Sequence, residues 1–342
     1  MHVQTELPEP KEAFQFKDLS VAGGQGPAAA FVAGAAMTVT PTAVAFGNFD
    51  GVHLGHRALI ASLRRAADRL GAAATIVTFD PHPLTVLRPG SAPLAVDPLA
   101  TRLELLAACG VDRTIVLRFD ADLAAKSAEW FVTEALCRRL GARAVLVGAD
   151  TRFGCGGRGD LALLRSLATE HGAEVEIAEG VSQDGALVSS SRVRAAIATG
   201  AVAEAATLLA RPFCLRGVVV RGDARGRTIG FPTANVSAPG QIQPAAGVYA
   251  CLAEVTGEDG ATVLRDAVVN VGTRPTFDGT RVQVEAHLPG WAGDLYDRVL
   301  PLHFIARLRN EQRFGGIDAL VAQIRRDVDA ALVQLAAWRS SP

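Results

Sequence analysis

From Thr42 onwards the chain alternates between short apolar runs and longer stretches with helical periodicity, and this alternation restricts the fold more than any other feature. The apolar runs predict strands at residues 43–46, 74–79, 113–117, 144–148 and 174–178, with helical patterns between them at 59–70, 101–109 and 130–140. Continuous apolar strands separated by helices are typical of a parallel sheet with both faces covered. We therefore predict a doubly wound, Rossmann-like α/β domain.

After Arg211 and Pro212 the pattern changes to short β-rich runs separated by turn residues, at 215–220, 247–255, 267–271, 282–287 and 300–304. This spacing predicts a small β-barrel of the Greek-key type. A final helix follows Gly315 and Gly316, and we expect its apolar stripe to cover the barrel. The stripe comprises Ile317, Leu320, Val321, Ile324, Val328, Leu332 and Leu335.

The length of 342 residues is enough for two domains. We predict an N-terminal extension at 1–42 with one short helix at 12–19, a first domain at 43–206 and a second at 207–342.

Composition and charge exclude several classes of protein. The 34 basic and 35 acidic side chains give a net charge of −1, which argues against a broad nucleic-acid surface. The five cysteines stand far apart, so a disulfide framework or a zinc ribbon is not expected and a reducing, cytoplasmic location fits best. The apolar stretch 28–37 is too short to span a membrane and follows acidic residues, so we expect neither an anchor nor a secretory signal.

The first strand runs into the string GNFDGVHLGH at residues 47–56, and a helix follows it. Gly47 and Gly51 allow the backbone to approach a ligand closely, and the start of the helix offers free N–H groups to an anion. His53 and His56 share one face of the first helical turn, where both can donate to one triphosphate. Two other interpretations stay open: a turn-capping histidine beside a packed one, or two zinc ligands without a third.

This string resembles the signature of nucleotidyltransferases that transfer AMP or CMP and release pyrophosphate. In particular, NFDGVH (48–53) is similar to the bacterial bifunctional riboflavin kinase/FAD synthetase family. VGADTRFG (147–154) resembles the family's second nucleotide segment, with Thr151 in place of the usual aromatic residue. VSSSRVR (188–194) resembles its phosphate loop, although alone it would read as a serine cap with exposed arginines. FDPHP (79–83) also matches and is expected to lie near FMN.

The resemblance implies a set of site residues in the first domain. Catalysis is expected of His53, His56 and Arg194. ATP and its phosphates are expected to contact Gly47, Phe49, Asp50, Gly51, Gly148, Asp150, Ser189, Ser190 and Ser191. Flavin is expected to contact Phe79, Asp80 and Pro81. Hydroxyls at a helix start beside a guanidinium suit the β- and γ-phosphates of the departing pyrophosphate.

The second half carries its own glycine-rich stretch at residues 217–235, which ends in FPTAN (231–235). Its glycines permit a loop that folds over phosphates, although glycines alone are more often hairpin turns. Thr233 and Asn235 alternate along a strand, so their oxygens point to one side and could hold Mg²⁺. FPTAN resembles the riboflavin kinase signature. The resemblance implies ATP binding by Gly222, Gly226, Arg227, Gly230, Phe231 and Pro232, and metal binding by Thr233 and Asn235.

Further segments resemble the same kinase module: GVY (247–249), NVGTRPTF (270–277) and LRNEQRF (308–314), whose Arg309 is expected to bind flavin. VEAHL (284–288) matches the strand that carries the family's catalytic carboxylate, here Glu285. A general base of this kind contributes roughly 10²–10⁴ in rate. Without its flanking motif, Glu285 would equally well be a barrel-rim glutamate paired with an arginine. Residues 289–291 depart from the usual Leu-Asp-Phe of the family.

Together the motifs imply an enzyme that phosphorylates riboflavin to FMN in its second domain and adenylylates FMN to FAD in its first. ATP and Mg²⁺ are implied for both steps, and riboflavin, FMN and ATP are the expected partners, with no nucleic acid and no membrane. The sequence leaves open a weak homo-oligomer. Two alternatives stay open: another nucleotidyltransferase with a non-catalytic barrel, and a flavin carrier without catalysis. Nucleic-acid binding is a weak third, because the barrel strands do not interleave aromatic and basic residues.

Overall fold

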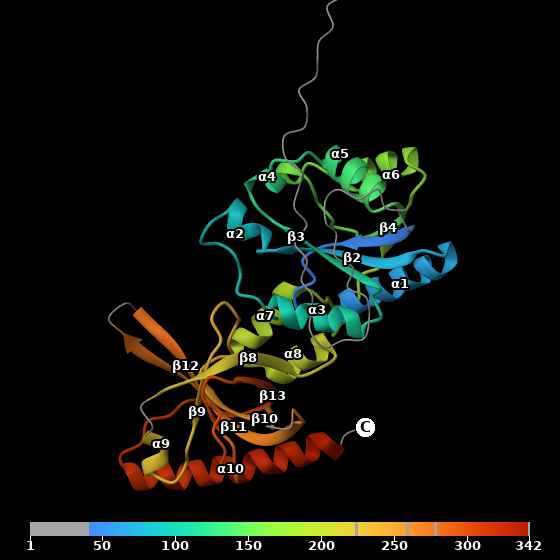
Figure 1. Ribbon diagram of the computed structural model, residues 1–342. Helices are drawn as coiled ribbons and strands as arrows, with labels where there is room; N and C mark the ends of the chain where they lie inside the picture. The colour runs from blue at the N-terminus through green and yellow to red at the C-terminus, as the bar shows by residue number, and fades with distance from the viewer. Residues whose placement is uncertain (1–40, 223–224, 258–259, 277–278, 341–342) are drawn as a thin grey trace, which may run out of the picture. The chain divides into compact units, whose positions relative to one another are not determined.

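The computed structural model describes residues 41–222, 225–257, 260–276 and 279–340 (Figure 1). The helix predicted at 12–19, and with it all but the end of the predicted N-terminal extension, lies outside the described residues. Contacts divide the chain into two compact units. The first holds the chain up to Phe49 together with His56–Pro93 and Leu103–Gly180, and the second holds Asp50–Gly55, Leu94–Arg102 and the chain from Val181 onwards. Each unit is described by itself.

The first unit is built on a five-stranded parallel sheet with the strand order β3-β2-β1-β4-β5. The strands are β1 (Thr42–Phe46), β2 (Ala73–Asp80), β3 (Arg113–Arg118), β4 (Ala142–Gly148) and β5 (Glu174–Ala178). The central strand β1 is buried along its whole length, as its unbroken apolar run requires. The predicted doubly wound α/β class is confirmed.

Helices separate these strands and cover the sheet. They are α1 (Leu54–Leu70), α2 (Pro83–Leu87), α3 (Leu99–Ala108), α4 (Ala121–Ala124), α5 (Ala128–Trp130), the π-helix η1 (Phe131–Arg139), the 3₁₀ turn η2 (Cys155–Gly157) and α6 (Leu161–Glu170). In Figure 1, α5 and α6 lie on one side of the sheet and α1 on the other. Phe46 of β1 contacts the ring edges of Phe131 and Phe153, with centroids 5.1 and 5.7 Å apart. The apolar pattern of α1 predicts one inward face from Leu59, Ile60, Leu63 and Ala67, of which the last three are buried and Leu59 is half-buried.

The second unit contains a closed barrel with the strand order β10-β11-β12-β9-β8-β13. Its strands are β8 (Phe213–Val220), β9 (Ala234–Ser237), β10 (Gly247–Thr256), β11 (Thr262–Thr276), β12 (Gly279–His287) and β13 (Val299–Arg309). The predicted small barrel is confirmed, and a short helix, α9 (Arg225–Thr228), interrupts the glycine-rich stretch before β9.

Two further helices of the second unit share the core of the barrel. They are α7 (Ser190–Thr199) and α8 (Val202–Leu209), preceded by the hairpin of β6 (Ser182–Gln183) and β7 (Ala186–Leu187). Ile197 and Leu208 join the same buried cluster as Phe213, Tyr249 and Phe304. These helices belong by contact to the barrel unit.

The last helix, α10 (Ile317–Ser340), packs on the barrel as predicted. Its buried residues Ala331 and Leu335, with Val328 beside them, contact the cluster that contains Val248 and Leu252 of β10. The prediction was wrong for Ile317 and Leu332, which are 65% and 39% exposed. Ile317 is the first residue of the helix, and Leu332 lies one position off the row formed by 328, 331 and 335. Across the part of the chain that the structure describes, no helix is both long and apolar enough to cross a bilayer.

Candidate active sites

In the first unit, three of the predicted motifs follow the carboxyl ends of three neighbouring strands. Gly47 and Phe49 follow β1, Gly148 and Asp150 lie at the end of β4, and FDPHP spans the end of β2. The carboxyl edge of a parallel sheet is where such folds bind ligands. The topology therefore brings Phe79, Asp80 and Pro81 to the same sheet edge as the first nucleotide motif.

Hydrogen bonds fix the loop after β1 against β2. The backbone N–H of Gly47 donates to the carbonyl of Val77 at 3.0 Å, and the Thr78 hydroxyl donates to the Asn48 carbonyl at 3.1 Å. His82 Nδ1 accepts the N–H of Leu84 at 3.2 Å. Its Nε2 lies 3.1 Å from the side-chain Nδ2 of Asn48. His82 thus links two motifs, a role that the sequence reasoning did not assign.

The segment after β4 folds tightly. Gly154 has φ +72°, and a side chain there would clash with the backbone of Ala128, so only glycine fits. Phe153 is buried against Phe46, whereas Asp150 is exposed and reaches back over Gly148. Thr151, which replaces the usual aromatic residue, is half-buried. The departure therefore leaves the turn and its buried phenylalanine in place.

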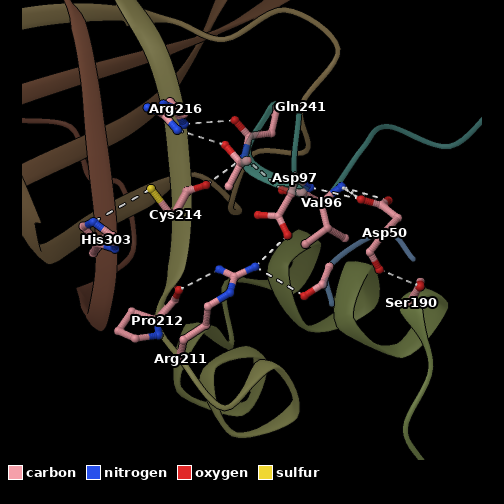
Figure 2. Close-up of polar contacts among 12 residues, drawn as sticks. Asp50, Val96, Asp97, Ser190, Arg211, Pro212, Cys214, Arg216, Gln241 and His303 are labelled. Atoms are coloured by element: carbon pink, nitrogen blue, oxygen red, sulfur yellow. Dashed lines mark hydrogen bonds and ion pairs between the residues drawn. The ribbon is translucent and has the colours of Figure 1, made fainter. Parts of the chain in front are cut away.

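In the second unit, Asp50 is buried and anchors three stretches of the chain (Figure 2). Its carboxylate accepts the N–H groups of Val96 and Asp97 at 3.0 Å and an N–H of Arg194 at 2.5 Å. Its carbonyl accepts the hydroxyl of Ser190 at 2.8 Å. The turn around this position is tight, because φ is positive at Phe49 (50°), Gly51 (88°) and Val52 (38°). Direct contact of Asp50 with phosphate stays a prediction.

The N-terminus of α7 carries the predicted phosphate-loop residues. Ser189 caps the helix by accepting the N–H of Arg192 at 3.2 Å, and Ser191 is exposed at the helix start. The two arginines are not free surface groups: Arg192 donates to the carbonyl of Gln183 at 2.7 Å, and Arg194 donates to Asp50 and to the carbonyl of Leu94. The serine cap that the alternative interpretation expects is therefore present, and both arginines are held in place by hydrogen bonds.

The two predicted histidines differ in their surroundings. His53 is only 5% exposed, and burial lowers its pKa from 6.5 to about 4, although Asp50 opposes the shift. Its imidazole is therefore neutral at pH 7 and can donate through a single N–H. His56 lies in the first turn of α1, with its ring centroid 5.0 Å from that of Phe49.

We expect His53 to make the protein less stable in mild acid. The unfolded histidine takes up its proton near pH 6.5 and the folded one only near pH 4, so stability present above pH 6.5 is lost as pH falls towards 4. Between pH 7 and 5 this amounts to about 2 kcal/mol. Denaturant unfolding of the wild type and of His53→Gln at both pH values measures it, because the variant lacks this loss. An equal pH dependence in both proteins would contradict the assignment.

A second buried ion pair, absent from the sequence reasoning, lies beside Asp50. Arg211 donates to Asp97 at 2.6 Å and to the carbonyl of Gly51 at 3.3 Å (Figure 2). Burial raises the pKa of Asp97 to about 6, and Arg211 only partly opposes it. Asp97 therefore raises the free energy of unfolding as pH falls through 6, whereas His53 lowers it. The contribution of Asp97 is present in both the wild type and His53→Gln, so the comparison of the two proteins isolates that of His53. Gln241 completes the cluster by donating to the carbonyls of Val96 and Cys214.

The barrel bears a pocket of about 530 Å³ that holds three of the predicted kinase residues, Arg227, Pro232 and Thr233. Trp291, from the segment that departs from the family pattern, and Tyr296, which follows that segment, also line the pocket. Guanidinium groups stack on both rings: Arg265 lies 5.7 Å from the Trp291 ring and Arg221 lies 5.0 Å from that of Tyr296. Trp291 thus keeps an aromatic ring at the last of the three departing positions, beside the pocket.

Two glycines of the loop before β9 abut the predicted metal ligands. A Cβ on Gly222 would collide with the side-chain amide of Asn235, and one on Gly226 would collide with the carbonyl of Phe231 and lie 3.4 Å from the Thr233 hydroxyl. Gly230 has φ +86°, where a side chain is strained. The loop therefore needs glycine at these positions to lie against Thr233 and Asn235.

Glu285 and Asn235 are brought together by strand register. They are direct partners between β12 and β9, and Asn270 of β11 faces Glu285 from the other side. Val284 and Ala286 point into the buried core, so Glu285 points to the opposite face of the strand. The structure thus places the predicted base beside one predicted metal ligand.

Arg309, predicted to bind flavin, is held by a buried carboxylate on α10. Its Nε and Nη2 donate to Asp327 at 2.9 and 2.7 Å, and Gln323 donates to the same carboxylate at 2.8 Å. The Arg309 guanidinium also lies 5.8 Å from the Phe314 ring. Asp327 therefore fixes this arginine, and no sequence signal linked the two residues.

Within the described ranges, no group of three or more His, Cys, Asp or Glu side chains could hold a metal. Thr233 and Asn235 instead offer a hydroxyl and an amide oxygen. Mg²⁺ prefers such oxygen ligands and keeps waters and substrate phosphates in its other positions. The donor set therefore fits Mg²⁺ bound together with ATP.

Comparisons with known proteins agree with this division of the chain. One family model, described as FAD synthetase, matches residues 36–192, and another, riboflavin kinase, matches 209–335. The bifunctional riboflavin kinase/FMN adenylyltransferase of Escherichia coli (strain K12) is 42% identical over 281 residues, 82% of this chain and 88% of that protein. The protein of the same description from Pseudomonas fluorescens is 40% identical, over 83% of this chain and 90% of its own.

A crystal structure described as a macrolide-efflux protein from Streptococcus pneumoniae has the same fold, with a TM-score of 0.78 and 31% identity. The match covers 86% of this chain and 95% of that one. A parallel α/β unit with a nucleotidyltransferase signature, followed by a closed barrel with a kinase signature, defines a two-site phosphotransfer enzyme. The chain belongs to the bifunctional riboflavin kinase/FMN adenylyltransferase family.

Proposed function

We propose that the second half of the chain phosphorylates riboflavin to FMN and that the first half transfers AMP from ATP to FMN, giving FAD and pyrophosphate. One observation carries the proposal: the two matched families occupy successive parts of one chain, and each part contains its own site motifs. ATP is the substrate of both steps, and FMN is the product of one and the substrate of the other. A weak homo-oligomer and a cytoplasmic location stay predictions.

In the adenylyl transfer, an FMN phosphate oxygen attacks the α-phosphorus of ATP, and pyrophosphate leaves. The nucleophile is already ionised, so the residues need only position the reactants and neutralise charge. His53, neutral through burial, and His56 donate N–H groups to the triphosphate. The helix start at Ser189–Ser191 receives the departing phosphates. Arg194, oriented by Asp50 at 2.5 Å, adds positive charge beside them.

In the kinase step, Glu285 accepts the proton of the riboflavin 5′-hydroxyl while that oxygen attacks the γ-phosphorus of ATP, and ADP leaves. Gly222, Gly226 and Gly230 let the loop close over the phosphates. Arg227 reaches them from the pocket wall. Thr233 and Asn235 would hold Mg²⁺, which neutralises phosphate charge when bound. Arg309, fixed by Asp327, orients the flavin.

The proposal is tested by following the products of riboflavin, ATP and Mg²⁺ over time by chromatography. We expect FMN to appear first and FAD to follow, with one ADP and one pyrophosphate released for each FAD. A parallel reaction started from FMN should release pyrophosphate without ADP. FAD from FMN with no consumption of riboflavin would favour a nucleotidyltransferase with an inert barrel. Binding of flavin with no product in either reaction would favour a carrier.

A further inference from the structure

Gln283 lies on β12 two residues before Glu285, and so on the same face of the strand. Its Nε2 is 2.5 Å from Oδ1 of Asn235 and 2.9 Å from Oε1 of Glu285. One side-chain amide thus bridges the proposed base and a proposed metal ligand. No motif and no role assigned above includes this residue.

The chemistry of the bridge follows from counting donors and acceptors. Glu285 and Asn235 are register partners, which brings a carboxylate and an amide carbonyl close together. The Gln283 amide has two N–H groups, one for each oxygen. These hydrogen bonds offset the repulsion between the two oxygens.

The bridge also fixes which end of Asn235 is available. Accepting from Gln283 holds Oδ1 on the side of Glu285, while Nδ2 lies nearest to Gly222 in the phosphate loop. A carbonyl oxygen has two lone pairs, so Oδ1 can accept this hydrogen bond and still bind a cation. The Gln283 amide therefore orients Asn235 so that the oxygen of Asn235, rather than its nitrogen, is available to a metal.

We propose that Gln283 is a positioning residue of the kinase reaction, which orients Glu285 towards the riboflavin hydroxyl and presents the Asn235 oxygen to Mg²⁺. This rests on the proposed function, since it takes Glu285 as the base and Asn235 as a ligand. In this proposal Gln283 acts through Glu285 and Asn235 rather than by direct contact with substrate or metal.

Two variants of the full-length enzyme test the proposal. Gln283→Met keeps the length of the side chain but removes both donors, and Gln283→Glu keeps the shape but turns the donors into acceptors. We expect the riboflavin kinase kcat to fall about tenfold to hundredfold in Gln283→Met, as for the loss of hydrogen bonds to charged groups. The Mg²⁺ concentration for half-maximal rate should rise while the KM for riboflavin changes less than about twofold. Gln283→Glu should be the slower of the two, because its acceptor oxygens would face the oxygens of Glu285 and Asn235. A purely steric role for Gln283 would instead make Gln283→Glu the faster variant, since it keeps the shape of the side chain.

Matched controls separate position from folding. FMN adenylylation by the same preparations should stay at the wild-type rate. Gln241→Met removes an equally engaged amide that bonds to the carbonyls of Val96 and Cys214, and it should leave the Mg²⁺ dependence of the kinase unchanged. Wild-type kcat and Mg²⁺ dependence in both Gln283 variants would overturn the proposal, and so would a parallel loss of both activities. Glu285→Gln tells this from a failure of the proposed function: if that variant keeps its kinase rate, the base itself is misassigned.

Discussion

The double variant His53→Ala/His56→Ala is expected to make FAD from FMN about 10²–10⁴-fold more slowly than the wild type, with riboflavin phosphorylation retained. Each histidine is proposed to donate a hydrogen bond to the charged triphosphate, worth about 1.5–3 kcal/mol. Two such losses add to about 3–6 kcal/mol in the barrier, which gives this range. The free start of a helix contributes less, about 0.3–1 kcal/mol when exposed, and cannot replace them. Pyrophosphate release from FMN and ATP measures the effect.

The control is His171→Ala, which removes an exposed histidine at the end of α6 and should leave both activities unchanged. His53→Asn/His56→Asn provides a second test, since the asparagine amide keeps an N–H donor and should recover part of the rate. FAD formation near the wild-type rate in the double alanine variant would show that the histidines do not contact the reacting phosphates.

Glu285→Gln is expected to lower the kcat of riboflavin phosphorylation by about 10²–10⁴-fold and to leave FMN adenylylation unchanged. The amide has the shape of the carboxylate but cannot take the proton of the attacking hydroxyl. Because the side chain keeps its size on β12, its register with Asn235 should be preserved. Riboflavin consumption under saturating ATP and Mg²⁺ measures kcat directly.

A barrel carboxylate outside the site serves as the control. Glu254→Gln alters a residue of β10 that contacts His303 at 2.7 Å, and it should change the kinase rate little. If Glu285→Gln phosphorylated riboflavin at the wild-type kcat, the reaction would need no base at this position, and the carboxylate would be a structural group of the barrel.

The strands could be predicted because buried strands of a parallel sheet consist of continuous apolar runs. Residues 43–46 and 144–148 are examples, and both lie within observed strands, β1 and β4. Helix ends were less accessible: the pattern predicted a helix from residue 59, whereas α1 begins at Leu54. Gly55 and His56 carry no apolar periodicity, so only the motif indicated the first turn of that helix, and His53, which the motif placed in that turn, lies just before it.

The site was predictable only as far as its motifs reach. Phe79, His53, Thr233 and Glu285 stand in strings that can be compared with a family. The residues that orient them do not, because their partners are distant in sequence: Arg194 pairs with Asp50 across 144 positions, and Gln283 bridges to Asn235 across 48. The sequence contains both members of such a pair, but it does not show that they come into contact in the folded protein. For the same reason the role of Asp50 as an anchor was not predicted.

The anchor at Asp50 limits how this enzyme can be redesigned. The side-chain carboxylate and the backbone carbonyl of Asp50 together link three stretches: the turn that contains Gly51, the segment at Val96 and the serine-rich start of α7. The effects of mutations in these three stretches are therefore coupled. A library that varies one stretch and keeps the other two constant should contain mostly inactive variants. Varying all three stretches together is the practical route to an enzyme that accepts a different nucleotide.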